Sequence, residues 1–206
     1  MNRLTFTLKA WPVIALATIG LCFLTKTVAG WLGIDLPDQQ NIDVVRQYLT
    51  QAFDSPKLFG TAAFLVAQVV VLMPAVEELV FRWLLFRLPQ RLLTRRRELT
   101  RGTGAAGETR GALSSIRSFD HSIIRSFDHS IIRSFDYSII LFSSTLFAAA
   151  HYLAQPWPDA AFLALFFFGL AQCWIYRKTG RLWCAMLNHA LFNLTNLVLL
   201  FILPAE

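Results

Sequence analysis

Two adjacent glutamates and an arginine lie inside an apolar stretch of this sequence. Residues 71–90 read VLMPAVEELVFRWLLFRLPQ, and the charged side chains at their centre are Glu77, Glu78 and Arg82. Glu78 and Arg82 are four residues apart, so on a helix they share a face and can form an ion pair. Glu77 points about 100° away from that face. An ion pair that only holds helices together explains Glu78 and Arg82, but it leaves Glu77 unexplained.

Two other apolar stretches carry histidine and asparagine. LFAAAHY places Phe147 and His151 one helical turn apart, and LNHALFNLTN does the same for His189 and Asn193. A lone polar residue in a membrane helix is more often a hydrogen-bond partner for another helix than a catalyst. Ionisable residues at membrane depth are nevertheless costly and indicate function by default.

The depths of these residues favour one shared site. At about 1.5 Å per residue, Glu77, His151 and Asn193 lie about 16–18 Å from the ends of their stretches, and His189 lies about 10 Å in. Side chains that only join helices have no reason to share a depth. We therefore predict that these groups meet in a cavity open to the cytoplasm.

The chain as a whole is too apolar for a soluble domain. Of its 206 residues, 55% are hydrophobic and 16% are charged, whereas soluble domains carry about 25% charged residues. A helix that crosses the membrane needs about 20 mostly apolar residues. We predict an all-α, polytopic bundle of about five membrane-spanning helices with the active site inside the bundle. The predicted crossings are residues 10–31, 58–88, 138–154, 160–176 and 182–203.

Charge asymmetry predicts the orientation. Residues 87–133 contain ten arginines, and the turn YRKTGR at 176–181 adds further basic residues. The charged residues of segment 33–57, in contrast, are mainly acidic. Because basic loops stay in the cytoplasm, we predict a cytoplasmic N-terminus and an external acidic loop. The net charge of +6 then indicates contact with anionic lipid and not with nucleic acid. We expect an integral protein of the bacterial inner membrane.

The predicted organisation has two parts. Residues 1–57 form an N-terminal membrane anchor, which we take to be uncleaved, and the external loop. Residues 58–206 form the core, in which Pro74 leaves open whether 58–88 is one kinked helix or two pieces. An insertion at about 99–137 interrupts the core, and three copies of an octapeptide such as IRSFDHSI occur at 116–139. Units this short indicate duplication in a tolerant cytoplasmic loop and not a solenoid.

The three motifs carry a family resemblance. EELVFR, FAAAH and HALFN match, in order, the EExxxR, FxxxH and HxxxN motifs of the CPBP family of intramembrane proteases. That family includes type II CAAX prenyl endopeptidases and proteins linked to bacteriocin processing and self-immunity. The resemblance covers roughly residues 58–203, apart from the insertion.

The resemblance implies an endopeptidase acting on a peptide or protein substrate in the membrane. Glu77 would be the general base that activates a water, helped by His151. His189 and Asn193 would donate hydrogen bonds to the oxyanion, and the Glu78–Arg82 ion pair would orient this set. No cofactor is needed for such a mechanism.

Three alternatives remain open, and the first of them uses nearly the same residues. Glu77, His151 and His189 are a reasonable ligand set for zinc, with one position left for water. A non-catalytic membrane scaffold or immunity protein could keep the same fold. A serine protease would use Ser143 or Ser144, but the sequence has no GxSxG turn.

Overall fold

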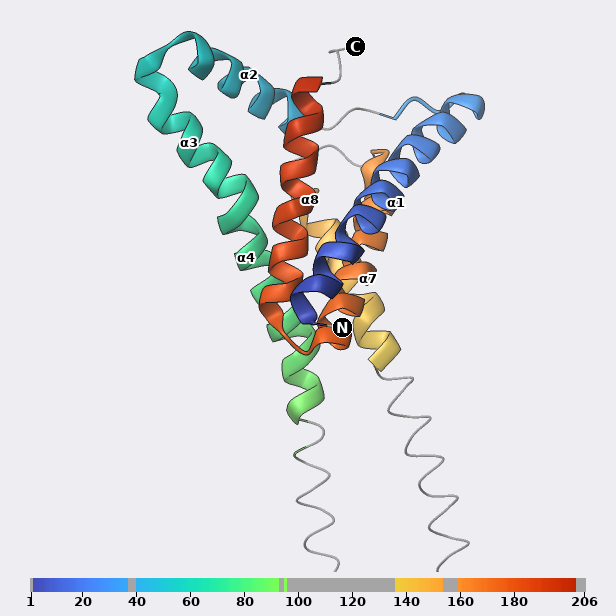
Figure 1. Ribbon diagram of the computed structural model, residues 1–206. Helices are drawn as coiled ribbons and strands as arrows, with labels where there is room; N and C mark the ends of the chain where they lie inside the picture. The colour runs from blue at the N-terminus through green and yellow to red at the C-terminus, as the bar shows by residue number, and fades with distance from the viewer. Residues whose placement is uncertain (1, 37–39, 93–94, 96–135, 154–158, 203–206) are drawn as a thin grey trace, which may run out of the picture.

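The computed structural model describes residues 2–36, 40–92, 95, 136–153 and 159–202, which form a bundle of helices (Figure 1). The described part of the chain contains helices and turns and no strand. The predicted all-α membrane bundle is therefore confirmed. The elements in chain order are α1 (Arg3–Trp31), α2 (Gln40–Asp54), η1 (Pro56–Leu58), α3 (Phe59–Ala67), η2 (Gln68–Leu72), α4 (Met73–Glu78), η3 (Leu79–Arg87), the unlabelled helix Asp136–Ala150, α7 (Ala161–Thr179) and α8 (Leu182–Ile202).

Three described helices are long and apolar enough to cross a membrane: Arg3–Trp31, Phe59–Leu92 and Leu182–Ile202. The other two predicted crossings correspond to Asp136–Ala150, a shorter apolar helix, and to the 19 residues of α7. The stretch with Pro74 is one continuous helix and not two pieces.

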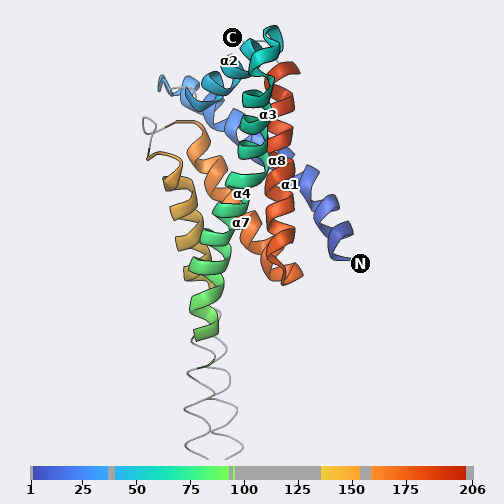
Figure 2. The same ribbon diagram turned by 90° about the vertical axis from the view of Figure 1, so that its left-hand side faces the viewer.

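The N-terminal helix packs into the bundle. The Trp11 indole N–H of α1 donates to the Thr195 hydroxyl of α8 over 3.3 Å. The Phe6 ring lies 5.1 Å from the Trp174 ring of α7, centre to centre. In both views α1 runs beside α7 and α8 (Figure 2). The predicted N-terminal anchor therefore also packs against the helices of the core and forms one side of the bundle.

The ends of the bundle agree with the charge pattern of the sequence. The start of α1, the end of the Phe59–Leu92 helix and the start of α8 lie at one end, whereas α2 and the end of α8 lie at the other (Figure 1). The basic residues around Arg87 and Arg177 therefore share an end with the N-terminus.

The acidic segment at 33–57 contains the helix α2, where the sequence indicated only a loop. Leu49 and Ala52 of α2, three residues apart, are buried. The Arg46 guanidinium donates to the Leu200 carbonyl near the end of α8 over 2.7 Å. An amphipathic face and this contact hold the segment helical against the bundle.

The helix that carries the glutamates is not uniformly α-helical. Its segments Gln68–Leu72 and Leu79–Arg87 are π-helical and flank Met73–Glu78. Pro74 has no N–H to donate within the helix. A π-helical turn beside proline is one way to accommodate that loss, and such turns often occur at functional sites.

A small residue brings α7 close to the Asp136–Ala150 helix. A Cβ at Gly169 would stand 3.0 Å from the Ser144 Cβ, closer than ordinary side-chain contact. Glycine at this position therefore permits the close approach. Most of the predicted insertion at about 99–137, with most of the octapeptide repeat, lies outside the described residues.

Candidate active site

Glu78 and Arg82 form the ion pair that their spacing allows. Arg82 Nε lies 3.2 Å from Glu78 Oε2, and neither side chain is exposed to solvent. A buried charge is costly unless a partner compensates it, so each side chain makes the burial of the other tolerable.

The arginine is held by a second helix. Its Nη1 donates to Ser143 Oγ over 3.4 Å, and its guanidinium carbon lies 5.1 Å from the centre of the Phe147 ring. Ser143 in turn donates to the carbonyl of Phe81 over 2.7 Å. The sequence suggests Ser143 only as a serine nucleophile. A serine inside an apolar stretch is the signal in the sequence for its contact with the ion pair.

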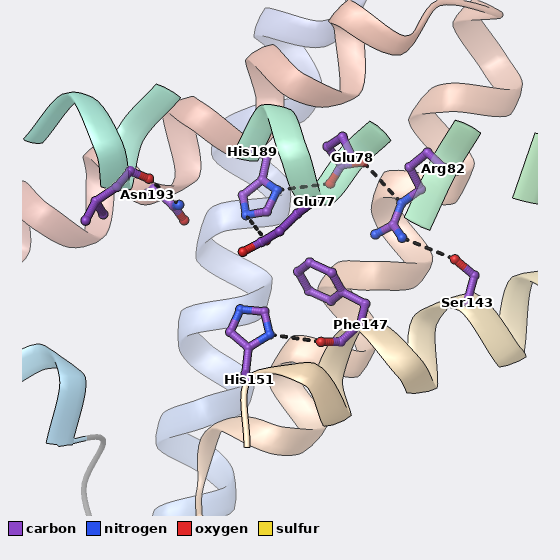
Figure 3. Close-up of polar contacts among 9 residues, drawn as sticks. Glu77, Glu78, Arg82, Ser143, Phe147, His151, His189 and Asn193 are labelled. Atoms are coloured by element: carbon purple, nitrogen blue, oxygen red, sulfur yellow. Dashed lines mark hydrogen bonds and ion pairs between the residues drawn. The ribbon is translucent and has the colours of Figure 1, made fainter. Parts of the chain in front are cut away.

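His189 bridges the two glutamates. Its Nδ1 lies 3.0 Å from Glu78 Oε1, and its Nε2 lies 3.6 Å from Glu77 Oε2 (Figure 3). An ionised carboxylate only accepts hydrogen bonds, so Nδ1 carries the hydrogen. Nε2 is then the nitrogen that faces Glu77.

The two adjacent glutamates have different surroundings. The Glu77 side chain is 20% exposed, whereas that of Glu78 is fully buried. The helix rotates by about 100° per residue, which directs the two side chains to different neighbours. Glu77 is therefore the carboxylate that a water molecule can reach.

His151 follows the end of the Asp136–Ala150 helix. Its Nδ1 lies 2.9 Å from the Phe147 carbonyl. Since a carbonyl only accepts, Nδ1 donates and Nε2 keeps a lone pair. The Phe147 ring contacts both histidines, with ring centres 4.9 Å from His151 and 5.7 Å from His189. No hydrogen bond or ion pair joins His151 to Glu77 within the described residues.

Asn193 lies one turn beyond His189 and contacts a different part of the glutamate helix. Its Nδ2 donates to the carbonyl of Val69 over 2.9 Å. The depth estimate from the sequence places Asn193 level with Glu77 and His189 shallower. The contacts place His189 beside Glu77, because the estimate assumed that the helices start at a common level.

The residues of the zinc alternative do not fit a metal ion as they lie. The described part of the chain contains no group of three histidine, cysteine or acidic side chains that could hold one. The Nδ1 bonds of His151 and His189 leave each Nε2 available, as in many metal sites, but the structure does not group His151 with His189 and Glu77 in the part of the chain that it describes. We derive no step through a metal.

The fold and the site define a polytopic helical membrane protein with ionisable groups gathered inside its bundle. The family described as type II CAAX prenyl endopeptidase Rce1-like matches residues 59–195, more than half of the chain. The chain belongs to this family and is an intramembrane peptidase. Comparisons with curated proteins and with solved structures gave no match.

Proposed function

We propose that this protein hydrolyses a peptide bond with a water molecule activated by Glu77. The observation that supports this role most directly is the contrast between the two glutamates. Glu78 is buried and compensated by Arg82 and His189, while Glu77 is partly exposed and lies 3.6 Å from His189 Nε2. A general base must reach both water and substrate, and of the two glutamates only Glu77 is exposed enough to meet that condition.

The reaction needs no covalent intermediate. Glu77 takes one proton from water while the water oxygen adds to the carbonyl carbon of the substrate. The resulting tetrahedral species carries the negative charge on the former carbonyl oxygen. The carbon–nitrogen bond breaks as the nitrogen receives the proton, from Glu77 directly or through Nε2 of His151. The products are a new carboxyl end and a new amine end.

His189 can stabilise the oxyanion only in its doubly protonated form. Its Nδ1 hydrogen is directed at Glu78, so donation from Nε2 requires a second proton. The Glu77 and Glu78 carboxylates lie on the two sides of the ring. Asn193 uses Nδ2 to bond Val69, and the second hydrogen on that nitrogen is its remaining donor.

The test compares wild-type protein with Glu77→Gln, which keeps the shape and removes the basic carboxylate. Both are expressed in the same host, and new termini in the membrane fraction are identified by mass spectrometry. We expect termini that depend on the wild-type protein and that fall by about 10²–10⁴-fold with the variant. Normal abundance of the variant in the membrane is the control.

Two results would overturn the proposal. Termini unchanged by Glu77→Gln would favour the scaffold alternative. Cleavage of an identified peptide that stops on chelation and returns with zinc would make Glu77, His151 and His189 ligands instead.

A single turnover in ¹⁸O-labelled water tests the route of the reaction directly. Direct attack by water places ¹⁸O in the new carboxyl group, whereas attack by the Glu77 carboxylate followed by hydrolysis at the Glu77 carbonyl would deliver ¹⁶O and leave the label on Glu77.

A further inference from the structure

The carbonyl of Val69 lacks a donor within its own helix. The α-helical donor for this oxygen would be the N–H of Met73, but that N–H bonds to Gln68. The π-helical donor would be the N–H of residue 74, and Pro74 has none. A backbone carbonyl without a partner in an apolar setting costs several kcal/mol. Val69 therefore needs a donor from elsewhere.

Asn193 supplies that donor from α8. Its Nδ2 lies 2.9 Å from the Val69 oxygen, and it bridges helices that are 124 positions apart in sequence. Pro74 is buried at the start of the α4 segment, three residues before Glu77. Asn193 is one turn after His189 on the opposite helix.

We propose that Pro74 and Asn193 act as a positioning pair for the glutamate helix. The proline frees the Val69 carbonyl, and the asparagine binds it, which fixes the level of α8 against the helix of Glu77. This bond and the His189 contacts are about one turn of α8 apart, so together they prevent both sliding and rotation. The pair thereby sets the distance between Glu77 and His189. Its effect on catalysis rests on the proposed function, but the bond itself does not.

A double-mutant cycle on stability tests the pair without using activity. Full-length protein is purified in detergent, and melting temperatures are measured for wild type, Asn193→Ala, Pro74→Ala and the double variant. Pro74→Ala restores an N–H in the helix, so Val69 no longer depends on Asn193. We expect Asn193→Ala to lower the melting temperature by about 2–4 °C in the wild-type background. The same change should have at most half that effect beside Pro74→Ala.

Asn196→Ala is the matched control, because Asn196 is an exposed asparagine on the same helix. It should leave the melting temperature unchanged in both backgrounds. Equal losses from Asn193→Ala with and without Pro74 would overturn the pair. So would no loss from Asn193→Ala in the wild-type background.

Activity gives a second, separate readout on a peptide identified with the wild-type enzyme. Pro74→Ala should lower kcat and leave KM within about twofold, because the change alters the geometry of Glu77 and not the binding of substrate. A changed KM with unchanged kcat would overturn the positioning role. Absence of cleavage by wild-type protein would instead count against the proposed function and leave the stability cycle valid.

Discussion

The polar residues of the site fall into two halves that differ in exposure. Glu78, Arg82 and Ser143 form the closed half, in which every side chain is fully buried. Glu77 and His151 belong to the open half and are partly exposed. The charges of the closed half face each other, whereas in the proposed mechanism the open half presents a carboxylate and a histidine Nε2 to a substrate. Under that proposal, one of two adjacent glutamates holds the site and the other reacts in it.

The largest expected effect comes from breaking the closed half. Arg82→Ala leaves the Glu78 carboxylate buried beside a cavity, and we expect a loss of about 3–5 kcal/mol in the free energy of unfolding. The measurement is membrane abundance together with thermal unfolding in detergent. Arg87→Ala is the control, since Arg87 is an exposed arginine of the same helix. A normally stable Arg82→Ala protein would remove the distinction between the halves.

Replacing both partners of the ion pair tests whether the loss of stability arises from the unpaired charge. Glu78→Gln with Arg82→Met keeps an acceptor for His189 but leaves no unpaired charge. Replacing a buried pair with neutral residues of similar size is often close to neutral for stability. The double variant should therefore recover most of the lost stability.

A smaller effect on stability, with the main loss confined to catalysis, is expected from the open half. His151→Asn places an amide N–H near the position of Nδ1, so the bond to Phe147 can persist, but it removes Nε2. We expect cleavage to fall by about 10²–10⁴-fold, with a stability change within about 0.5 kcal/mol. Unchanged cleavage would exclude His151 from proton transfer. A large loss of stability would instead assign it to the closed half.

The smallest expected effect distinguishes two neighbouring serines. Ser143→Ala removes the hydroxyl that bonds Arg82 and the Phe81 carbonyl, and should cost about 1 kcal/mol. Ser144→Ala is the matched control, because Ser144 is equally buried but lies against Gly169. Thermal unfolding should show a larger loss of stability for Ser143→Ala than for Ser144→Ala. Equal losses would mean that the contact with Arg82 contributes nothing of its own.

The sequence by itself determined the class of the fold and the pairs within single helices. Long apolar runs predict spanning helices because the backbone must satisfy its own hydrogen bonds in lipid. A spacing of four residues allowed the Glu78–Arg82 pair, which the structure contains at 3.2 Å. The charge pattern also agrees with the structure, in which the basic ends of the glutamate helix and of α7 lie at the same end of the bundle (Figure 1). These features depend only on local periodicity and on the cost of burial.

Only the tertiary structure decided which helices meet and at what level. The bridge from His189 to both glutamates and the bond from Asn193 to Val69 depend on how α8 is shifted along the glutamate helix. The helix α2 owes part of its order to a contact with the far end of α8. Residue spacing fixes angles and distances within one helix, but it carries no information on the offset between two. That offset is set by packing and by hydrogen bonds such as the one from Asn193 to Val69. The Val69 carbonyl needs this partner because Pro74 has no N–H.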